Sequence, residues 1–493
     1  MSRGSDAQPL SGPQLDSLVQ QDLRLFEVPG IAVGIVKDGR VVYAKGAGVR
    51  SLRSRLPVDD RTLFGIASNT KGFTAAALGL LVEEGKIKWD DKVADRLPGF
   101  RLYDALATRE LTVRDLLCHR SGLATGAGDL MHDPDSTTFS VGEIIYNLRY
   151  IKPAYSFRSR FAYDNNLFLV AGELVRRVSG QLWEEFVEEH ILAPLKMTAS
   201  SASYRGVRDR ENVIDAHKKV DGVLRTVTRY ASMVDDPAGG IYSNVDDMIR
   251  WMRLFLDSGS LEGTGFSRRT IKELVSPQVL IPTEGGGVYR THFAAYGLGW
   301  FMSDVCGYKK IFHTGQDVGM VSEVAMIPEL GLGIVVLANS ETNVAMAITD
   351  QIVDGYLGIK NDESKGKLDR LAGYMQRIDS VKREVWKRVG REQTDADAGR
   401  YAGTYRDRWF GDVVISYRGG ELRFAAVRSP QLRGVLRPYE KGRFVIRWDN
   451  AEIDADAFVS FEHDGLVMKS IAEGMGFNFE GMELKRVRTD IKK

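Results

Sequence analysis

Residues 68–84 read SNTKGFTAAALGLLVEE, and the rest of the chain is interpreted outward from this stretch. Its run of Ala and Leu predicts a largely buried helix that ends at Gly85. Ser68 and Lys71 stand three residues apart at the helix start, so both side chains fall on one face and can meet. A serine needs a base to act as a nucleophile, and a partly desolvated lysine is such a base.

The Ser-x-x-Lys pattern is short and has a plain structural alternative. It occurs again from Ser364 to Lys367, within a charged segment. The alternative is that Ser68 caps the helix and Lys71 stays in water. The pattern by itself therefore leaves both interpretations open.

Strands are predicted on either side of this helix. Residues 31–49 form two apolar runs joined by Asp38-Gly39, which predicts a β-hairpin. Further strands are expected over 296–304, 308–316, 321–329 and 332–340, followed by a helix over 343–357. The intervening stretch, from about 90 to 275, is mostly helical in pattern. We therefore expect an α+β fold, in which an antiparallel sheet built from distant segments is flanked by helices and faces a helical lobe across a cleft.

The last part of the chain changes its pattern. Residues 361–398 are dense in charge and predict a connecting helix with solvated faces. Short segments that alternate apolar and polar residues follow, and they predict a C-terminal antiparallel β-barrel. The expected division is a catalytic domain over 1–357, a linker over 358–398 and a barrel domain over 399–489.

Composition excludes several classes of function. The 493 residues carry 67 basic and 66 acidic side chains, a net charge of +1, which argues against a nucleic-acid partner. No run approaches the roughly 18 apolar residues of a membrane span, so no membrane association is expected. The first residues lack the apolar core of a signal peptide, which favours the cytoplasm, whereas a removed leader would make the protein periplasmic or secreted. Cys118 and Cys306 indicate neither a disulfide framework nor a metal site.

Two further short segments carry reactive groups. Tyr163-Asp164-Asn165 precedes a predicted helix, and His313-Thr314-Gly315 ends a predicted strand. A lysine cation beside a tyrosine lowers the pKa of the phenol, so Tyr163 beside Lys71 is a candidate general base. Each segment alone also fits a structural role: a packed Tyr163 ring, an Asn165 helix cap and a hydrogen-bonded strand histidine at His313.

Taken in order, Ser-x-x-Lys, Tyr-x-Asn and His-Thr-Gly resemble the signature segments of the serine β-lactamase and penicillin-binding-protein superfamily. The resemblance is to the branch of class C β-lactamases, D-alanyl-D-alanine carboxypeptidases, D-aminopeptidases and family VIII esterases. Residues 117–123, LCHRSGL, and 238–243, AGGIYS, are also similar to segments common in that branch. The resemblance extends from about residue 14 to 357.

This resemblance implies roles for individual residues. Ser68 would be the acylated nucleophile, Lys71 its proton partner, and Tyr163 the general base and later the acid for the leaving group. Asn165 would orient Lys71 and substrate. The substrate would be bordered by His313, Thr314 and Gly315, and the backbone N–H groups of Ser68 and Gln316 would form the oxyanion hole. The reaction would be acyl transfer through a covalent acyl-enzyme, with no metal or other cofactor.

One position bears on the substrate. Many β-lactamases have a lysine where His313 stands, and a histidine is mostly neutral at pH 7. We therefore expect a serine hydrolase that acts on small esters or D-amino-acid amides and only weakly on β-lactams. The alternatives are a D-stereospecific peptidase or carboxypeptidase and, from another class, a non-catalytic binding or scaffold protein that keeps the fold. The partner would be a small molecule or a peptide, and homo-oligomerisation is left open.

The C-terminal strands resemble the lipocalin-like domain appended to some members of this superfamily, on the basis of Gly403-Thr404-Tyr405 and the strand spacing. Residues 408–411, RWFG, put two large aromatic rings beside a turn. This turn is hypothesised to reach the cleft or a neighbouring subunit, and the alternative is that its rings fill the barrel core. The sequence lacks G-x-S-x-G, H-E-x-x-H and P-loop motifs, and its histidines show no metal-ligand spacing.

Overall fold

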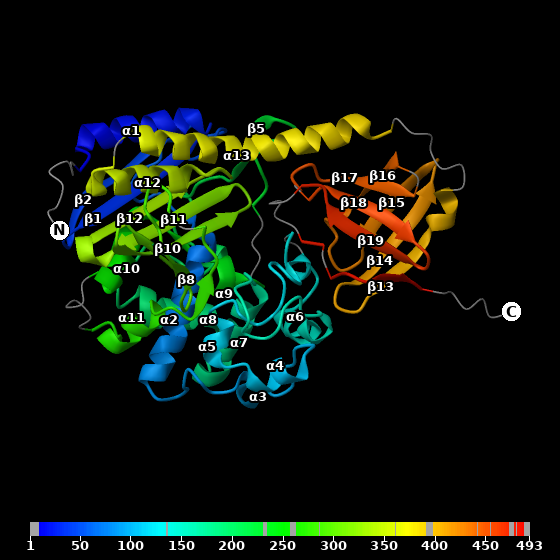
Figure 1. The fold of residues 1–493 in the computed structure, drawn as a ribbon, viewed down its shortest axis with the longest axis horizontal. Helices are drawn as coiled ribbons and strands as arrows, with labels where there is room; N and C mark the ends of the chain where they lie inside the picture. Colours follow the sequence, from blue (N-terminus) through cyan, green and yellow to red (C-terminus); the bar gives the residue numbers. More distant parts are fainter. Residues whose placement is uncertain are drawn as a thin grey trace.

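An eight-stranded antiparallel sheet forms the centre of the larger domain (Figure 1). The computed structural model describes residues 9–134, 137–229, 234–256, 263–284, 286–359, 361–390, 398–440, 442–453, 455–472, 478–479 and 481–487. The strand order across the sheet is β2 (Arg40–Gly48), β1 (Gly30–Lys37), β12 (Leu332–Ala338), β11 (Met320–Ile327), β10 (Tyr308–Asp317), β9 (Phe301–Val305), β8 (Ala294–Tyr296) and β7 (Val279–Ile281).

The sheet joins segments that are far apart in the sequence, as the pattern predicted. The Asp38-Gly39 turn connects β1 and β2, and Gly39 has a φ of 72°, a conformation that glycine adopts at little cost. Strand β1 then pairs with β12, with Ile31 opposite Ala338. Seven of the eight β1 residues are buried, because helices cover both faces of the sheet at this point.

Two layers of helices enclose the sheet (Figure 1). Helices α1 (Gly12–Leu25) and α12 (Val344–Leu357) pack on one face, in a core shared with Ile31 and Ile334. Helices α10 (Val245–Leu256) and α2 (Thr70–Glu83) pack on the other face, and α2 is buried along most of its length, as its Ala- and Leu-rich sequence predicts. The helical lobe lies beyond α2 and includes α6 (Val141–Asn147) and α7 (Asn166–Ser179).

The prediction of one continuous strand over 296–304 is wrong. The chain forms two strands there, β8 and β9, joined by a tight turn in which the Gly297 N–H donates to the Trp300 carbonyl at 2.8 Å. Gly299 has a φ of 78° in this turn. The apolar pattern runs through the turn because Leu298 and Trp300 are both buried, so alternation alone does not mark the reversal.

Helix α13 (Asn361–Arg388) connects the larger domain to a closed barrel (Figure 1). The barrel consists of β13 (Gly403–Asp407), β14 (Gly411–Arg418), β15 (Glu421–Ala426), β16 (Arg433–Glu440), β17 (Arg443–Trp448), β18 (Ala457–Glu462), β19 (Gly465–Ser470) and β20 (Leu484–Arg486). The predicted α+β domain with a C-terminal antiparallel barrel is thus confirmed, and a closed eight-stranded barrel is consistent with the lipocalin-like expectation. The domain boundaries stay predictions, and residues 391–397 and 488–489 lie outside the described part of the chain.

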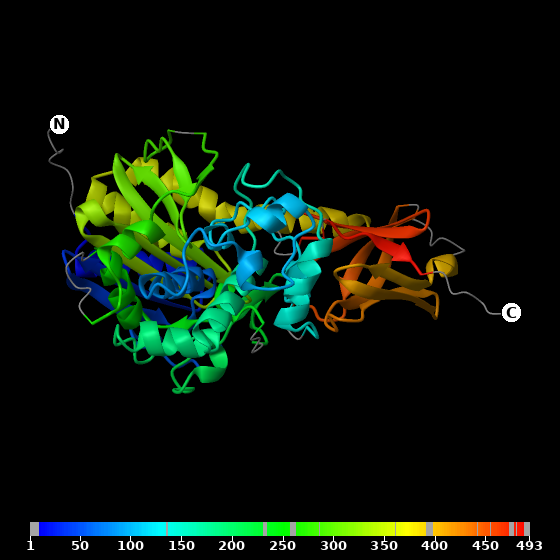
Figure 2. The same cartoon turned by 90° about the horizontal axis from the view of Figure 1, so that it is seen from below.

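The helical lobe and the barrel are in direct contact, and Figure 2 shows the segments around α6 against the barrel strands. Asn147 Nδ2 donates to the Trp409 carbonyl at 2.9 Å, and the Arg408 guanidinium lies 4.4 Å from the centre of the Tyr150 ring. The rings of Trp409 and Phe410 are buried, so the 408–411 turn meets the lobe through its backbone and Arg408. Among the described residues, no helix combines the length and apolarity needed to cross a membrane.

Candidate active site

Ser68 and Lys71 meet as their spacing predicted. Ser68 lies in a short 3-10 turn, Ala67–Asn69, directly before α2, and Lys71 is the second residue of that helix. Lys71 Nζ lies 2.9 Å from Ser68 Oγ and 2.9 Å from the Ala238 carbonyl oxygen. Ala67 has a φ of 47°, an uncommon conformation for a residue with a Cβ, which turns the chain sharply just before Ser68.

Strands β10 and β11 hold this turn in place. Asn69 Nδ2 donates to Ser322 Oγ at 2.8 Å, and Ser322 Oγ donates to the Ile66 carbonyl at 2.7 Å. Gly315 lies so close to the turn that a Cβ at this position would collide with the Ile66 carbonyl oxygen. A glycine is therefore required at 315 for the strand to approach Ser68.

Lys71 is fully buried, and its two hydrogen-bond partners are a hydroxyl and a carbonyl. Burial lowers the pKa of Lys71 to about 7, although the charges of Asp129, Asp235 and Asp164 act in the opposite direction. A substantial fraction of the Lys71 side chains is therefore unprotonated at neutral pH and can accept a proton from Ser68.

Tyr163 lies on the other side of the amine. Lys71 Nζ is 5.0 Å from the centre of its ring, and the His119 ring stacks on it with centroids 4.1 Å apart. Burial raises the pKa of Tyr163, while a hydrogen bond with Ser68 lowers it by less. The lowering of the Tyr163 pKa that was expected from a Lys71 cation is not found. Burial disfavours the charged form of both groups, so the phenol keeps its proton and the amine loses part of its positive charge.

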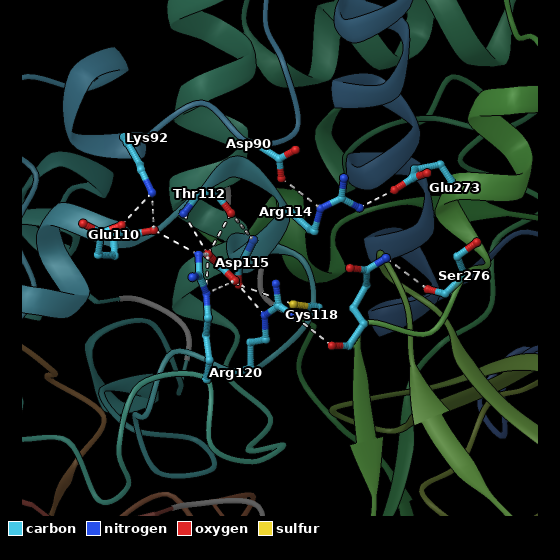
Figure 3. Close-up of polar contacts among 12 residues, drawn as sticks. Asp90, Lys92, Glu110, Thr112, Arg114, Asp115, Cys118, Arg120, Glu273 and Ser276 are labelled. Carbon is cyan, nitrogen blue, oxygen red and sulfur yellow. Dashed lines mark hydrogen bonds and ion pairs between the residues drawn. The ribbon is translucent and has the colours of Figure 1, made fainter.

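An ion network is centred on the buried Asp115 (Figure 3). Asp115 is fully buried and accepts from Arg120 Nε at 2.6 Å, from Arg158 Nη2 at 2.5 Å and from Thr112 Oγ1 at 2.7 Å. Arg120 Nη1 also donates to the Gln278 carbonyl at 2.7 Å, which ties the network to the start of the outer sheet strands. These contacts hold the pKa of Asp115 below its usual range against the effect of burial.

The same network fixes the loop that carries Tyr163. The Arg158 N–H donates to the Arg120 carbonyl at 2.8 Å, and the Ala162 N–H donates to the His119 carbonyl at 2.8 Å. On the other side of Tyr163, the Asp164 N–H donates to His119 Nδ1 at 3.0 Å. The 117–123 segment therefore acts as the structural partner of the Tyr163 loop.

Asn165 lies near the site, and its side chain contacts a residue that sequence reasoning missed. Asn165 Nδ2 donates to Asp129 Oδ2 at 2.8 Å, and Asn166 Nδ2 donates to Asp129 Oδ1 at 3.1 Å. His132 Nε2 lies 3.3 Å from the same carboxylate. Asp129 follows the glycines at 126 and 128 in a loop, and no spacing in the sequence connects it to residues 36 positions later.

The His313-Thr314-Gly315 segment lies within β10, beside the Ser68 turn. His313 is 1% exposed, its Nε2 is 2.9 Å from the Tyr296 hydroxyl and its Nδ1 is 2.6 Å from the Thr314 carbonyl. Burial, followed by the charge of Lys71, lowers the pKa of His313 to about 3, so the ring is neutral at pH 7. Thr314 is half-buried and Gln316 is exposed, and β9 pairs with β10 only as far as Phe312.

Other features lie outside this site. Among the described residues, no group of three or more His, Cys, Asp or Glu side chains could hold a metal ion. A cavity of about 540 Å³ opens between α13, the barrel and the larger domain, and none of its described lining residues is a predicted site residue. Cys118 is buried and Cys306 is exposed, and neither forms a disulfide.

Comparison with known sequences agrees with the fold. The chain is similar to an unguisins hydrolase of Aspergillus violaceofuscus, at 26% identity over 392 residues that cover 73% of this chain and 67% of the relative. It is also similar to protein flp of Staphylococcus aureus, at 25% identity over 334 residues that cover 67% of this chain and 63% of the relative.

Solved structures share the fold of the chain. The octameric penicillin-binding protein homologue from Pyrococcus abyssi superposes with a TM-score of 0.61 at 22% identity, covering 97% of this chain and 100% of the homologue. SurE superposes with a TM-score of 0.57 at 18% identity, covering 96% of this chain and 98% of the other.

Family models divide the chain in a similar way. A model described as a domain of unknown function, DUF3471, matches residues 387–486, the region of the barrel. A model described as beta-lactamase matches residues 15–355, which is well over half of the chain. The chain therefore belongs to the beta-lactamase family, whose members include serine β-lactamases and penicillin-binding-protein-like hydrolases.

Proposed function

We propose that the protein is a serine hydrolase that cleaves small esters or D-amino-acid amides through an acyl-enzyme on Ser68. The observation that carries this proposal is the environment of Lys71. Its amine is fully buried, 2.9 Å from Ser68 Oγ, and burial brings its pKa to about 7. Such an amine is a base at the pH of most cells, and it is already in contact with the hydroxyl that it would deprotonate.

Acylation follows from this geometry. Neutral Lys71 takes the proton of Ser68 as Oγ bonds to the substrate carbonyl carbon. The carbonyl oxygen becomes negative and accepts from the backbone N–H groups of Ser68 and Gln316, each worth about 3 to 4 kcal/mol to the transition state. The intermediate then collapses, and the bond to the leaving group breaks.

Tyr163 serves the leaving group. Burial raises the pKa of its phenol, so the phenol keeps its proton until the leaving group takes it. The Lys71 ammonium then returns a proton to Tyr163, which restores both residues. Water repeats the sequence in the second half-reaction. Lys71 accepts a proton from water as the water oxygen bonds to the acyl carbon, the bond from the acyl carbon to Ser68 Oγ breaks, and Oγ takes back the proton held by Lys71. The first base is thus Lys71 and the acid is Tyr163.

Substrate preference rests on the neutral His313. Its two ring nitrogens are engaged by Tyr296 and Thr314, so it offers no cation to a substrate carboxylate. Loss of one charge-assisted hydrogen bond costs about 1.5 to 3 kcal/mol, which weakens binding about ten- to a hundredfold. β-Lactams carry such a carboxylate, whereas small esters and amides of D-amino acids do not depend on it.

A substrate panel tests the proposal. Wild type, Ser68→Ala and Ser364→Ala are compared on p-nitrophenyl acetate and butyrate, nitrocefin, and D- and L-alanine p-nitroanilide. Ser364 begins the second Ser-x-x-Lys and is the matched control. We expect Ser68→Ala to lose all activity, Ser364→Ala to keep it, and nitrocefin to be the poorest substrate. Equal activity of Ser68→Ala and wild type on every compound contradicts the proposal.

The penicillin-binding protein homologue with this fold is described as octameric. We extend the expectation of self-association to this chain. Light scattering coupled to size-exclusion chromatography measures it, and a mass equal to one 54.9 kDa chain at all concentrations rejects it.

A further inference from the structure

The barrel forms hydrogen bonds with one loop of the helical lobe at three points. We name residues 124–134 and 137–139 the clamp loop. Asn478 Nδ2 donates to the Thr125 carbonyl at 2.6 Å, near one end of this loop. Ser429 Oγ donates to the Leu130 carbonyl at 3.4 Å in the middle. At the other end, Arg428 donates to Thr138 Oγ1 and to its carbonyl, both at 2.8 Å.

The clamp loop carries Asp129, which lies between the first two of these contacts. Its carboxylate is 18% exposed and accepts from Asn165, from Asn166 and from His132. A carboxylate only accepts hydrogen bonds, so the Asn165 amide must present Nδ2 to Asp129. Its Oδ1 is therefore turned away from Asp129.

We propose that the barrel is a clamp which, through Asp129 as a positioning residue, sets the orientation of Asn165 and the charge on Lys71. This inference rests on the proposed function, in which Ser68 and Lys71 carry out the chemistry. It assigns a role to the barrel that requires no contact between the barrel and substrate.

Electrostatics agree with the geometry. Asp129 is the carboxylate with the largest effect on Lys71, and its negative charge favours the ammonium form. The other ionisable groups that face Lys71 come from several elements; they are Asp235, Asp164, Tyr163, His119 and His313. Of these, Asp129 alone lies in the clamp loop, so movement of the loop changes its distance from the amine while the others stay.

Two variants test the clamp with p-nitrophenyl acetate as the substrate. Asp129→Asn removes the charge at constant size. The triple variant Arg428→Ala/Ser429→Ala/Asn478→Ala removes the side-chain contacts at all three points. The hydrogen bond from the Thr138 N–H to the Arg428 carbonyl and the Asn147 contact to Trp409 remain and hold the domains together. The matched control is Arg437→Ala, which breaks an exposed barrel pair with Glu421 away from the loop. The pH profile of kcat/KM and the melting temperature are measured for each.

We expect Asp129→Asn to move the acidic midpoint of the kcat/KM profile about one pH unit lower, because Lys71 loses the charge that favours its protonation. The triple variant should move the midpoint in the same direction by less, and its plateau should fall up to about a hundredfold. Arg437→Ala should match wild type. A merely structural defect lowers the plateau and leaves the midpoint in place.

Two results overturn the inference. One is a wild-type midpoint in both Asp129→Asn and the triple variant, and the other is a triple variant that behaves like Arg437→Ala. If Asp129→Asn fails to fold, the triple variant alone decides, because its substitutions lie on the barrel. Failure of the proposed function is recognised separately, because Ser68→Ala would then hydrolyse p-nitrophenyl acetate as well as wild type does.

Discussion

Lys71, on α2, and Lys310, on β10, are both buried lysines. Burial disfavours the ammonium form of both amines. Lys71 contacts a hydroxyl and a carbonyl, and its pKa falls to about 7. Lys310 lies 3.5 Å from Glu323 and 3.6 Å from Asp350, and these carboxylates raise its pKa despite the burial.

The difference shows what makes a buried lysine a base. Burial lowers the pKa of both lysines. Only carboxylates in direct contact with the amine offset this effect, because they stabilise the ammonium form. The three aspartates that influence Lys71 act at a distance and do not hydrogen-bond to its amine. The fold thus lowers the pKa of one buried lysine and raises that of the other, and we propose proton transfer for Lys71 alone.

The largest expected effect comes from replacing each lysine by arginine, which stays protonated at any working pH. Lys71→Arg cannot accept the Ser68 proton, so kcat/KM on p-nitrophenyl acetate should fall about a thousandfold. Lys310→Arg keeps the cation beside Glu323 and Asp350 and should keep kcat/KM within about threefold of wild type. Similar losses in both variants would mean that the two lysines do not differ in role.

Replacement by methionine sharpens the comparison through stability. Lys310→Met leaves the buried Glu323 without its cation, whereas Asp350 keeps its ion pair with Lys367 at 2.6 Å. The free energy of unfolding should fall by about 3 kcal/mol in urea titrations at pH 7. Lys71→Met removes an amine whose burial costs stability below pH 7, a cost that fades as the pH rises from 7 towards 10.5. Lys71→Met should therefore unfold no more easily than wild type. A loss equal to that of Lys310→Met refutes this assignment.

The pH profile of wild type gives a smaller but direct effect. In the proposed mechanism the neutral form of Lys71 is the base, so kcat/KM should rise about tenfold per pH unit and level off above a midpoint near 7. Stopped-flow acylation from pH 5 to 9 measures this. Lys310 has a raised pKa, so it does not titrate between pH 5 and 9 and should cause no change of kcat/KM in that range. A profile that is flat from pH 5 to 8 excludes Lys71 as the base.

The smallest expected effect is that of Glu323→Gln. Glu323 is 1% exposed and burial raises its pKa to about 7, so its carboxyl is already partly protonated at neutral pH. Between its unfolded value of 4.5 and 7, the folded state holds the proton more tightly, and stability falls as the pH rises. Glu323→Gln should flatten this slope and change the unfolding free energy by less than about 1 kcal/mol. An unchanged slope between pH 5 and 7.5 contradicts the assignment.

What the sequence predicts depends on how local the determinant is. The hairpin at Asp38-Gly39 and the meeting of Ser68 with Lys71 follow from spacings of a few residues, and both are found. The reversal at Gly297–Gly299 was missed because burial continues through the turn.

The contacts that set protonation could not be predicted, because they join distant residues. Asp129 reaches Asn165 across 36 positions, and Glu323 reaches Lys310 from the next strand. The pKa of Tyr163 is raised, although the sequence predicted that it would be lowered. The prediction considered only the neighbouring Lys71, whereas the burial that raises this pKa depends on the whole fold.

The pairing of Ile31 with Ala338 has a consequence for how the protein is made. A ribosome adds about 5 to 20 residues per second, so β12, which pairs with the inner edge of β1, is synthesised roughly 15 to 60 s after β1. During that interval a strand of sequence GIAVGIVK has β2 as its partner on one side only. Nascent chains halted before residue 332 should therefore bind chaperones, and chains extended past β12 should be released from them.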